Sequence, residues 1–153
     1  MLTRLRKTLY RARGHVDGQL GGERFRLDPY HSKFWRRASA GNWEPETFAV
    51  LRDHLAPDRD YLDIGAWIGP TVLFGARRAR HVYCFEPDPV AFRHLAWNIE
   101  LNGLRNVSAF AVALSNRFGV ARMASFGGEA GDSMTSLLNA GGDQGMDVVT
   151  VGW

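Results

Sequence analysis

The chain has 153 residues, a length that corresponds to one domain, and 45% of them are hydrophobic, which excludes a wholly disordered chain. No apolar run reaches the ~18 residues that cross a bilayer, and the basic N-terminus lacks the apolar stretch of a secretory signal. The single cysteine excludes an internal disulfide, so these features together predict a cytoplasmic protein.

The net charge of +3 is unevenly distributed, because basic residues are concentrated near the N-terminus. Leu2, Leu5 and Leu9 fall on one stripe of a helix there. Two interpretations remain open: a solvated helix that docks its leucines on the domain, or a basic helix that binds an anionic membrane surface or nucleic acid. We predict that residues 1–42 form a basic, irregular N-terminal extension with a flexible glycine-rich joint at residues 18–22.

Residues 43–153 are predicted to form the main domain, in which strand and helix patterns alternate. Pro45, Pro70 and Pro89 each stand at a first-turn position, Asp88 is a helix N-cap, and Gly103 supplies a left-handed stop. The predicted elements in chain order are a helix from residue 45, a strand at 61–64, a helix from 70, a strand at 81–85, a helix from 89 to 101 and a strand at 107–112. Shorter β-like segments follow at 120–126 and 147–151, on either side of a long loop at 125–145.

The order strand, helix, strand, helix, strand predicts an α/β protein with a Rossmann-like fold. Right-handed crossovers stack such short apolar strands as a parallel sheet, and helices cover both of its faces to give three αβα layers. Only the N-terminal half of that sheet is expected in this chain. In this fold class ligands bind at the carboxyl ends of the strands.

The residues at those ends predict a site for an adenosine that carries no phosphate. Gly65 and Gly69 follow the first strand as G-x-x-x-G, which differs from the G-x-G-x-x-G pattern of dinucleotide sites. Glu86 follows the second strand, 23 positions after Asp63, near the offset of a carboxylate that holds a ribose. The simpler interpretation is ordinary turn chemistry and a solvated strand end.

Four segments together resemble the FkbM-type methyltransferase family over roughly residues 43–123. The segments are 63–71, 85–89, 98–104 and 113–115. The resemblance implies a class I methyltransferase fold, S-adenosylmethionine as cofactor, and O-methylation of a sugar, polyketide or other small molecule. Trp67 departs from the family pattern, because a small polar residue is commoner at that position.

The resemblance also implies roles for particular residues. Asp63, Gly65 and Gly69 would shape the methionine pocket, and Glu86 would hold the ribose. Ala113 and Leu114 would lie near the adenine. Ala66 and Pro87 complete the predicted cofactor-binding set.

Several functions are not predicted for the chain. The histidines have no metal-ligand spacing, so no metal site is expected, and no residue can be named as the catalytic base. The basic N-terminus leaves an RNA methyltransferase possible, but the sequence has no N/D-P-P-Y/F tetrapeptide to support base methylation. The resemblance implies a small-molecule substrate, and a nucleic acid is not expected.

The family's fourth strand and the rest of its sheet have no counterpart in the sequence. We therefore expect an inactive, truncated methyltransferase that self-associates through the exposed edge of the strand at residues 61–64. The alternative is a non-catalytic remnant that acts as a binding or interaction domain, and an NAD enzyme is a weaker third choice.

Overall fold

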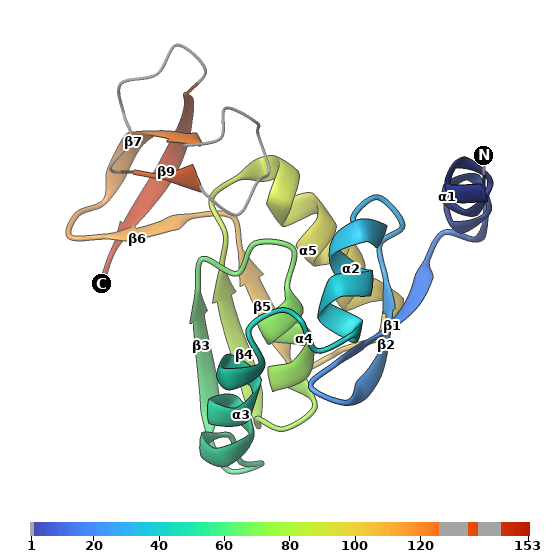
Figure 1. Cartoon of the computed structure of the whole chain (residues 1–153). Coiled ribbons are helices and arrows are strands. Elements are labelled where there is room, and N and C mark those ends of the chain that lie inside the picture. The colour runs from blue at the N-terminus through green and yellow to red at the C-terminus, as the bar shows by residue number, and fades with distance from the viewer. Residues whose placement is uncertain (1, 126–134, 138–144) are drawn as a thin grey trace.

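The computed structural model describes residues 2–125, 135–137 and 145–153 (Figure 1). The described residues form five α-helices: α1 Leu2–Arg13, α2 Ser32–Ser39, α3 Pro45–His54, α4 Pro70–Ala76 and α5 Pro89–Leu101. The strands are β1 Val16–Leu20, β2 Glu23–Leu27, β3 Asp60–Ile64, β4 His81–Phe85, β5 Val107–Phe110, β6 Ala113–Ser115, β7 Gly119–Ser125, β8 Thr135–Ser136 and β9 Met146–Gly152. None of the described helices has the length and apolar character needed to cross a bilayer.

Strands β3, β4 and β5 form a parallel sheet in that order, and α4 and α5 make the two crossovers. In the register of this sheet Asp63 pairs with Cys84 and Ile64 with Phe85, so the ends of β3 and β4 lie side by side. The α/β fold with a parallel sheet that the sequence predicts is therefore confirmed. The predicted N-cap is also confirmed, because Asp88 caps α5 by accepting hydrogen bonds from the backbone N–H groups of Val90 and Ala91.

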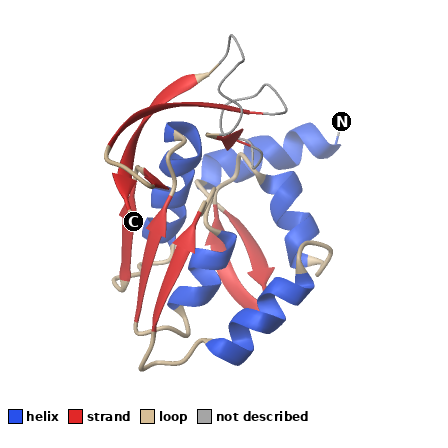
Figure 2. Cartoon of the chain, turned by 90° about the vertical axis from the view of Figure 1, so that its left-hand side faces the viewer, coloured by secondary structure: helices blue, strands red, loops and turns tan. Residues whose placement is uncertain are grey.

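The crossover helices α4 and α5 lie on one face of this sheet. In Figure 1, α2, α4 and α5 lie to the right of β3–β5, and Figure 2 views the strands from the left-hand side. Both crossovers are right-handed and run in one direction along β3, β4 and β5, so both helices fall on the same face. The second helical layer of a three-layer fold is not formed by the described residues, and large apolar side chains are exposed: Leu62, Ile64, Tyr83 and Phe110.

Strand β3 is an edge strand among the described residues, since β4 is its one partner in the sheet. Leu62 is 38% exposed and Ile64 is 61% exposed on that strand. Unpaired edges with exposed apolar side chains promote association between chains. Self-association through this edge stays a prediction.

The N-terminal segment is more ordered than the sequence predicts. Residues 16–27 form an antiparallel hairpin, with Gly21 and Gly22 in its turn at φ values of 57° and 91°, so the expected flexible joint is a strand and a tight turn. Leu20 and Leu27 of the hairpin and Trp35 of α2 share one hydrophobic cluster with Phe74 of α4. A boundary after residue 42 stays a prediction, although residues on both sides of it share a core.

One of the two interpretations of the N-terminal helix, in which its leucines dock on the domain, was wrong. Leu5 and Leu9 of α1 are 63% and 65% exposed and do not dock on the domain. The buried face of α5 consists of Ala91, His94, Leu95 and Asn98. The sequence does not indicate this buried face, because it includes a histidine and an asparagine and polar residues are not expected at core positions.

The remaining strands form a mixed sheet in the order β6-β9-β7-β8. It stands above the carboxyl ends of β3–β5 (Figure 1). The two β-like segments predicted near residues 120–126 and 147–151 correspond to β7 and β9. Most of the predicted loop at 125–145 lies outside the described residues.

Candidate functional site

The turn after β3 is held against the end of β4 by backbone hydrogen bonds. The N–H groups of Gly65 and Ala66 both donate to the Phe85 carbonyl, at 2.9 and 3.0 Å. Gly65 and Gly69 have φ values of 82° and 91°, a conformation that glycine adopts without the steric cost of a Cβ. Trp67 has a φ of 49° in the same turn, which is unusual for a large side chain. The turn is thus a constrained left-handed structure.

Glu86 is buried at the end of β4 and is bonded to this turn. Its Oε2 accepts from the Trp67 N–H at 2.7 Å, and its Oε1 accepts from the Asp88 N–H at 2.8 Å. The residue is 4% exposed. Burial raises the pKa of Glu86 above its usual value, although the two N–H donors oppose the rise. The carboxylate is therefore not a solvated strand end, and it joins the turn to the start of α5.

Asp63 is buried at the end of β3, on the helix-covered face of the sheet. Its Oδ2 accepts from the Thr71 hydroxyl at 2.6 Å and from the Tyr61 hydroxyl at 3.1 Å. Burial raises the pKa of Asp63, and the two hydroxyl donors partly offset that rise. Asp63 thus connects β3 to the first turn of α4.

Four of the eight predicted cofactor residues line one pocket at the carboxyl ends of the strands. Gly65, Pro87, Ala113 and Leu114 surround a volume of about 150 Å³, together with Met123 of β7. The other four, Asp63, Ala66, Gly69 and Glu86, are buried beside the pocket and do not line it. Their roles in cofactor binding stay predictions.

The structure also assembles a cluster of titratable side chains that the sequence analysis missed. Asp28 is fully buried before α2, and its Oδ1 lies 2.8 Å from Nδ1 of His31 and 3.4 Å from Nδ1 of His94. The Trp35 indole N–H donates to Oδ2 of the same carboxylate at 2.9 Å. Burial alone would raise the pKa of Asp28, but hydrogen bonds from His31 and Trp35 and the charge of His31 lower it. Burial lowers the pKa of His94, although the Asp28 charge opposes that change.

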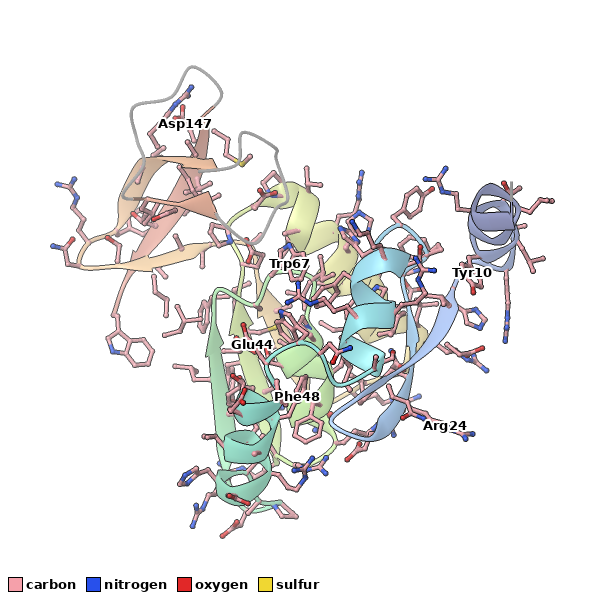
Figure 3. The ribbon with its side chains drawn as sticks, viewed as in Figure 1. Tyr10, Arg24, Glu44, Phe48, Trp67 and Asp147 are labelled. Atoms are coloured by element: carbon pink, nitrogen blue, oxygen red, sulfur yellow. The ribbon has the colours of Figure 1, made fainter. Side chains whose placement is uncertain are left out.

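This cluster adjoins the turn after β3, because the His31 and Trp67 rings lie 5.9 Å apart between centroids. In Figure 3, Trp67 lies between the top of the parallel sheet and α2. The three-residue spacing of Asp28 and His31 was the one local signal in the sequence. No local pattern could have added His94, since it lies on α5, far along the chain.

Gly69 has a packing role that Gly65 lacks. A Cβ at Gly69 would lie 2.7 Å from Cδ1 of Leu95, whereas a Cβ at Gly65 would meet no atom within 4 Å. We expect Gly69→Ala to lower the free energy of unfolding by about 3 kcal/mol, since strain and overpacking add. Gly65→Ala, the matched control, adds strain alone and should cost about 1–2 kcal/mol. Urea denaturation measures both, and equal losses would contradict the assigned contact.

No family model and no curated protein matches the chain. Solved structures with partial likeness include an rRNA methylase from Streptococcus thermophilus, at 18% identity and a TM-score of 0.43 over 44% of this chain and 41% of that one. M. jannaschii TYW2 in complex with AdoMet is 27% identical, with a TM-score of 0.46 over 63% and 42% of the two chains. A tRNA methyltransferase of M. jannaschii is 17% identical, with a TM-score of 0.45 over 72% and 44%.

The matched region spans about two fifths of the length of each of these structures. All three TM-scores are below 0.5, so the fold of the chain rests on its own strand order and crossovers.

Proposed function

We propose that the chain is the cofactor-binding part of an S-adenosylmethionine-dependent methyltransferase. The observation that carries the proposal is the contact between the G-x-x-x-G turn after β3 and the Glu86 carboxylate at the end of β4, 2.7 Å from the Trp67 N–H. Adjacent carboxyl ends of parallel strands are the place where this fold class binds ligands. A carboxylate there accepts ribose hydroxyls, and a glycine turn with no phosphate-binding pattern suits a nucleoside that carries no phosphate.

The residue types at the site suit an adenosine, but the cavity between them is small for one. The pocket of about 150 Å³ is smaller than the roughly 300–1,000 Å³ of typical ligand sites. Both Glu86 oxygens already accept one backbone N–H each, yet each has a second lone pair for a hydroxyl. Glu86 is 4% exposed, so the side chains that cover it must shift before a ribose reaches these lone pairs.

The bound cofactor would supply an activated methyl group, and the chain's own residues would orient it and its acceptor. We assign the base to His31, whose Nδ1 is paired with the buried Asp28 carboxylate at 2.8 Å. In that arrangement the carboxylate orients the ring and leaves Nε2 free to take a proton from an alcohol. The acceptor we propose is the hydroxyl of a small molecule, in line with the FkbM-like segments.

Calorimetric titration of the whole chain with S-adenosylmethionine, its demethylated product and NAD tests the proposal. We expect either sulfur nucleoside to bind at least tenfold more tightly than NAD, because the turn lacks the backbone site for a pyrophosphate. NAD binding of equal or greater affinity would refute the proposal. Tight nucleoside binding without methyl transfer to sugars or polyketides agrees both with the expected inactive, truncated enzyme and with the non-catalytic remnant.

A further inference from the structure

A second and larger concavity lies away from the candidate cofactor site, between the β1–β2 hairpin, α2 and the ends of α4 and α5. Its volume is about 870 Å³. Four arginines line it, together with the polar side chains of Gln19, Ser39 and Asn102. The arginines are Arg24, Arg26, Arg36 and Arg77, and we call this concavity the arginine groove.

The sheet pleat and the helix ends aim these arginines outward. On β2, Phe25 and Leu27 are buried while Arg24 and Arg26 are exposed, which places both guanidinium groups on the outer face, roughly 7 Å apart along the strand. Figure 3 shows Arg24 pointing away from the body of the chain. Arg77 follows α4, and its guanidinium lies 5.6 Å from the centre of the Phe25 ring. The ring contact thus holds the Arg77 guanidinium beside the hairpin.

One carboxylate, that of Asp17, lies opposite Arg26 in the β1–β2 register among the residues that the structure describes. None of the four arginines forms an ion pair there, whereas Arg78, next to Arg77, pairs with Glu23. Asp17 is the acidic residue that lines the groove, and it is paired with Arg13 at 3.1 Å. Ten of the 19 lysines and arginines but three of the 16 acidic residues lie in residues 1–40, so this segment of the sequence is basic.

The shape of the groove favours one strand of nucleic acid over a membrane. None of the large exposed hydrophobic side chains lines it, so nothing there can insert into a lipid layer. A concave lining with charges at strand spacing follows a phosphodiester backbone, and a duplex is too wide to enter a volume of this size. We infer that the arginine groove binds single-stranded nucleic acid through its phosphates.

Fluorescence anisotropy with a labelled 12-nucleotide single-stranded RNA tests this inference on the whole chain. The logarithm of the association constant should fall with the logarithm of salt concentration with a slope near −3, because each of four phosphate contacts contributes about −0.7. Arg24→Glu/Arg26→Glu should weaken binding at least tenfold and reduce the slope by about 1.4. Arg105→Glu/Arg117→Glu, which changes net charge equally at exposed positions outside the groove, should weaken binding less than threefold.

Circular dichroism establishes that each variant is folded, and Arg24→Gln/Arg26→Gln repeats the test without reversing charge. Three outcomes would overturn the inference: no binding to the RNA, equal losses in the two charge-reversal variants, or binding to anionic phosphatidylserine vesicles with none to RNA. Because the test needs neither cofactor nor methyl transfer, its failure is distinct from failure of the proposed enzyme.

Discussion

Replacing Glu86 with alanine is expected to weaken S-adenosylmethionine binding about 100-fold. The proposed ribose contacts are hydrogen bonds to a charged acceptor in a buried place, each worth roughly 1.5–3 kcal/mol, and tenfold in affinity corresponds to about 1.4 kcal/mol. Glu86→Gln keeps the shape and one acceptor oxygen, so it should lose about tenfold. Titration calorimetry at a temperature where every variant is folded gives these affinities.

Asp88 provides the control for that experiment, and its environment decides which substitution to use. It is fully buried and accepts hydrogen bonds from the N–H groups of Val90 and Ala91, so Asp88→Ala removes a helix cap worth about 1 kcal/mol of stability. Asp88→Ser retains a capping oxygen and removes the charge. Affinity in Asp88→Ser should stay within about threefold of the unaltered chain, and a loss equal to that of Glu86→Ala would end the ribose assignment.

Replacing Asp28 with alanine is expected to lower the free energy of unfolding by about 3–5 kcal/mol. The carboxylate is 0% exposed and accepts hydrogen bonds from the backbone N–H groups of Tyr30 and His31 as well as from three side chains. Without it the Trp35 indole N–H, on a residue 1% exposed, has lost its acceptor in the core. Burying donors without acceptors is among the largest costs of a single substitution. Urea or thermal denaturation measures the loss.

The same variant should change the pH dependence of stability. The folded pKa of Asp28 is lowered, so its contribution is present above its unfolded value near 3.8 and is lost as pH falls through the lower folded pKa. The unaltered chain should therefore lose more stability below about pH 3.8 than Asp28→Ala does. Asp17→Ala is the matched control, since the Arg13–Asp17 pair is largely exposed and worth at most ~1 kcal/mol. Equal losses in both variants would show that the buried network is not stabilising.

Much of the candidate site could be predicted from the sequence because its signals are local. Gly65 and Gly69 lie within one turn, and Asp88 caps a helix that starts at the next residue. Short-range sterics and hydrogen bonds decide such features, so neighbours in sequence are sufficient to read them. The parallel order of β3, β4 and β5 follows from the alternation of elements and right-handed crossovers.

The burial of Glu86 could not be predicted from its neighbours in the sequence. It depends on the Trp67 N–H, 19 residues away, turning back onto the carboxylate. The sequence indicates an acidic strand end, but it does not indicate whether water or the protein satisfies the charge.

The sequence by itself determined the alternation of strands and helices and the turn that joins β3 to α4, since each depends on residues a few positions apart. Tertiary structure alone decided that residues 16–39 belong to the core, that Asp28, His31 and His94 meet, and that four arginines share a groove. These arrangements pair residues 70 or more positions apart, as in the contacts of Asp28 with Asn98 and of Arg26 with Asn102. Such contacts form when whole hydrophobic faces pack together, and the chain's local preferences do not encode them.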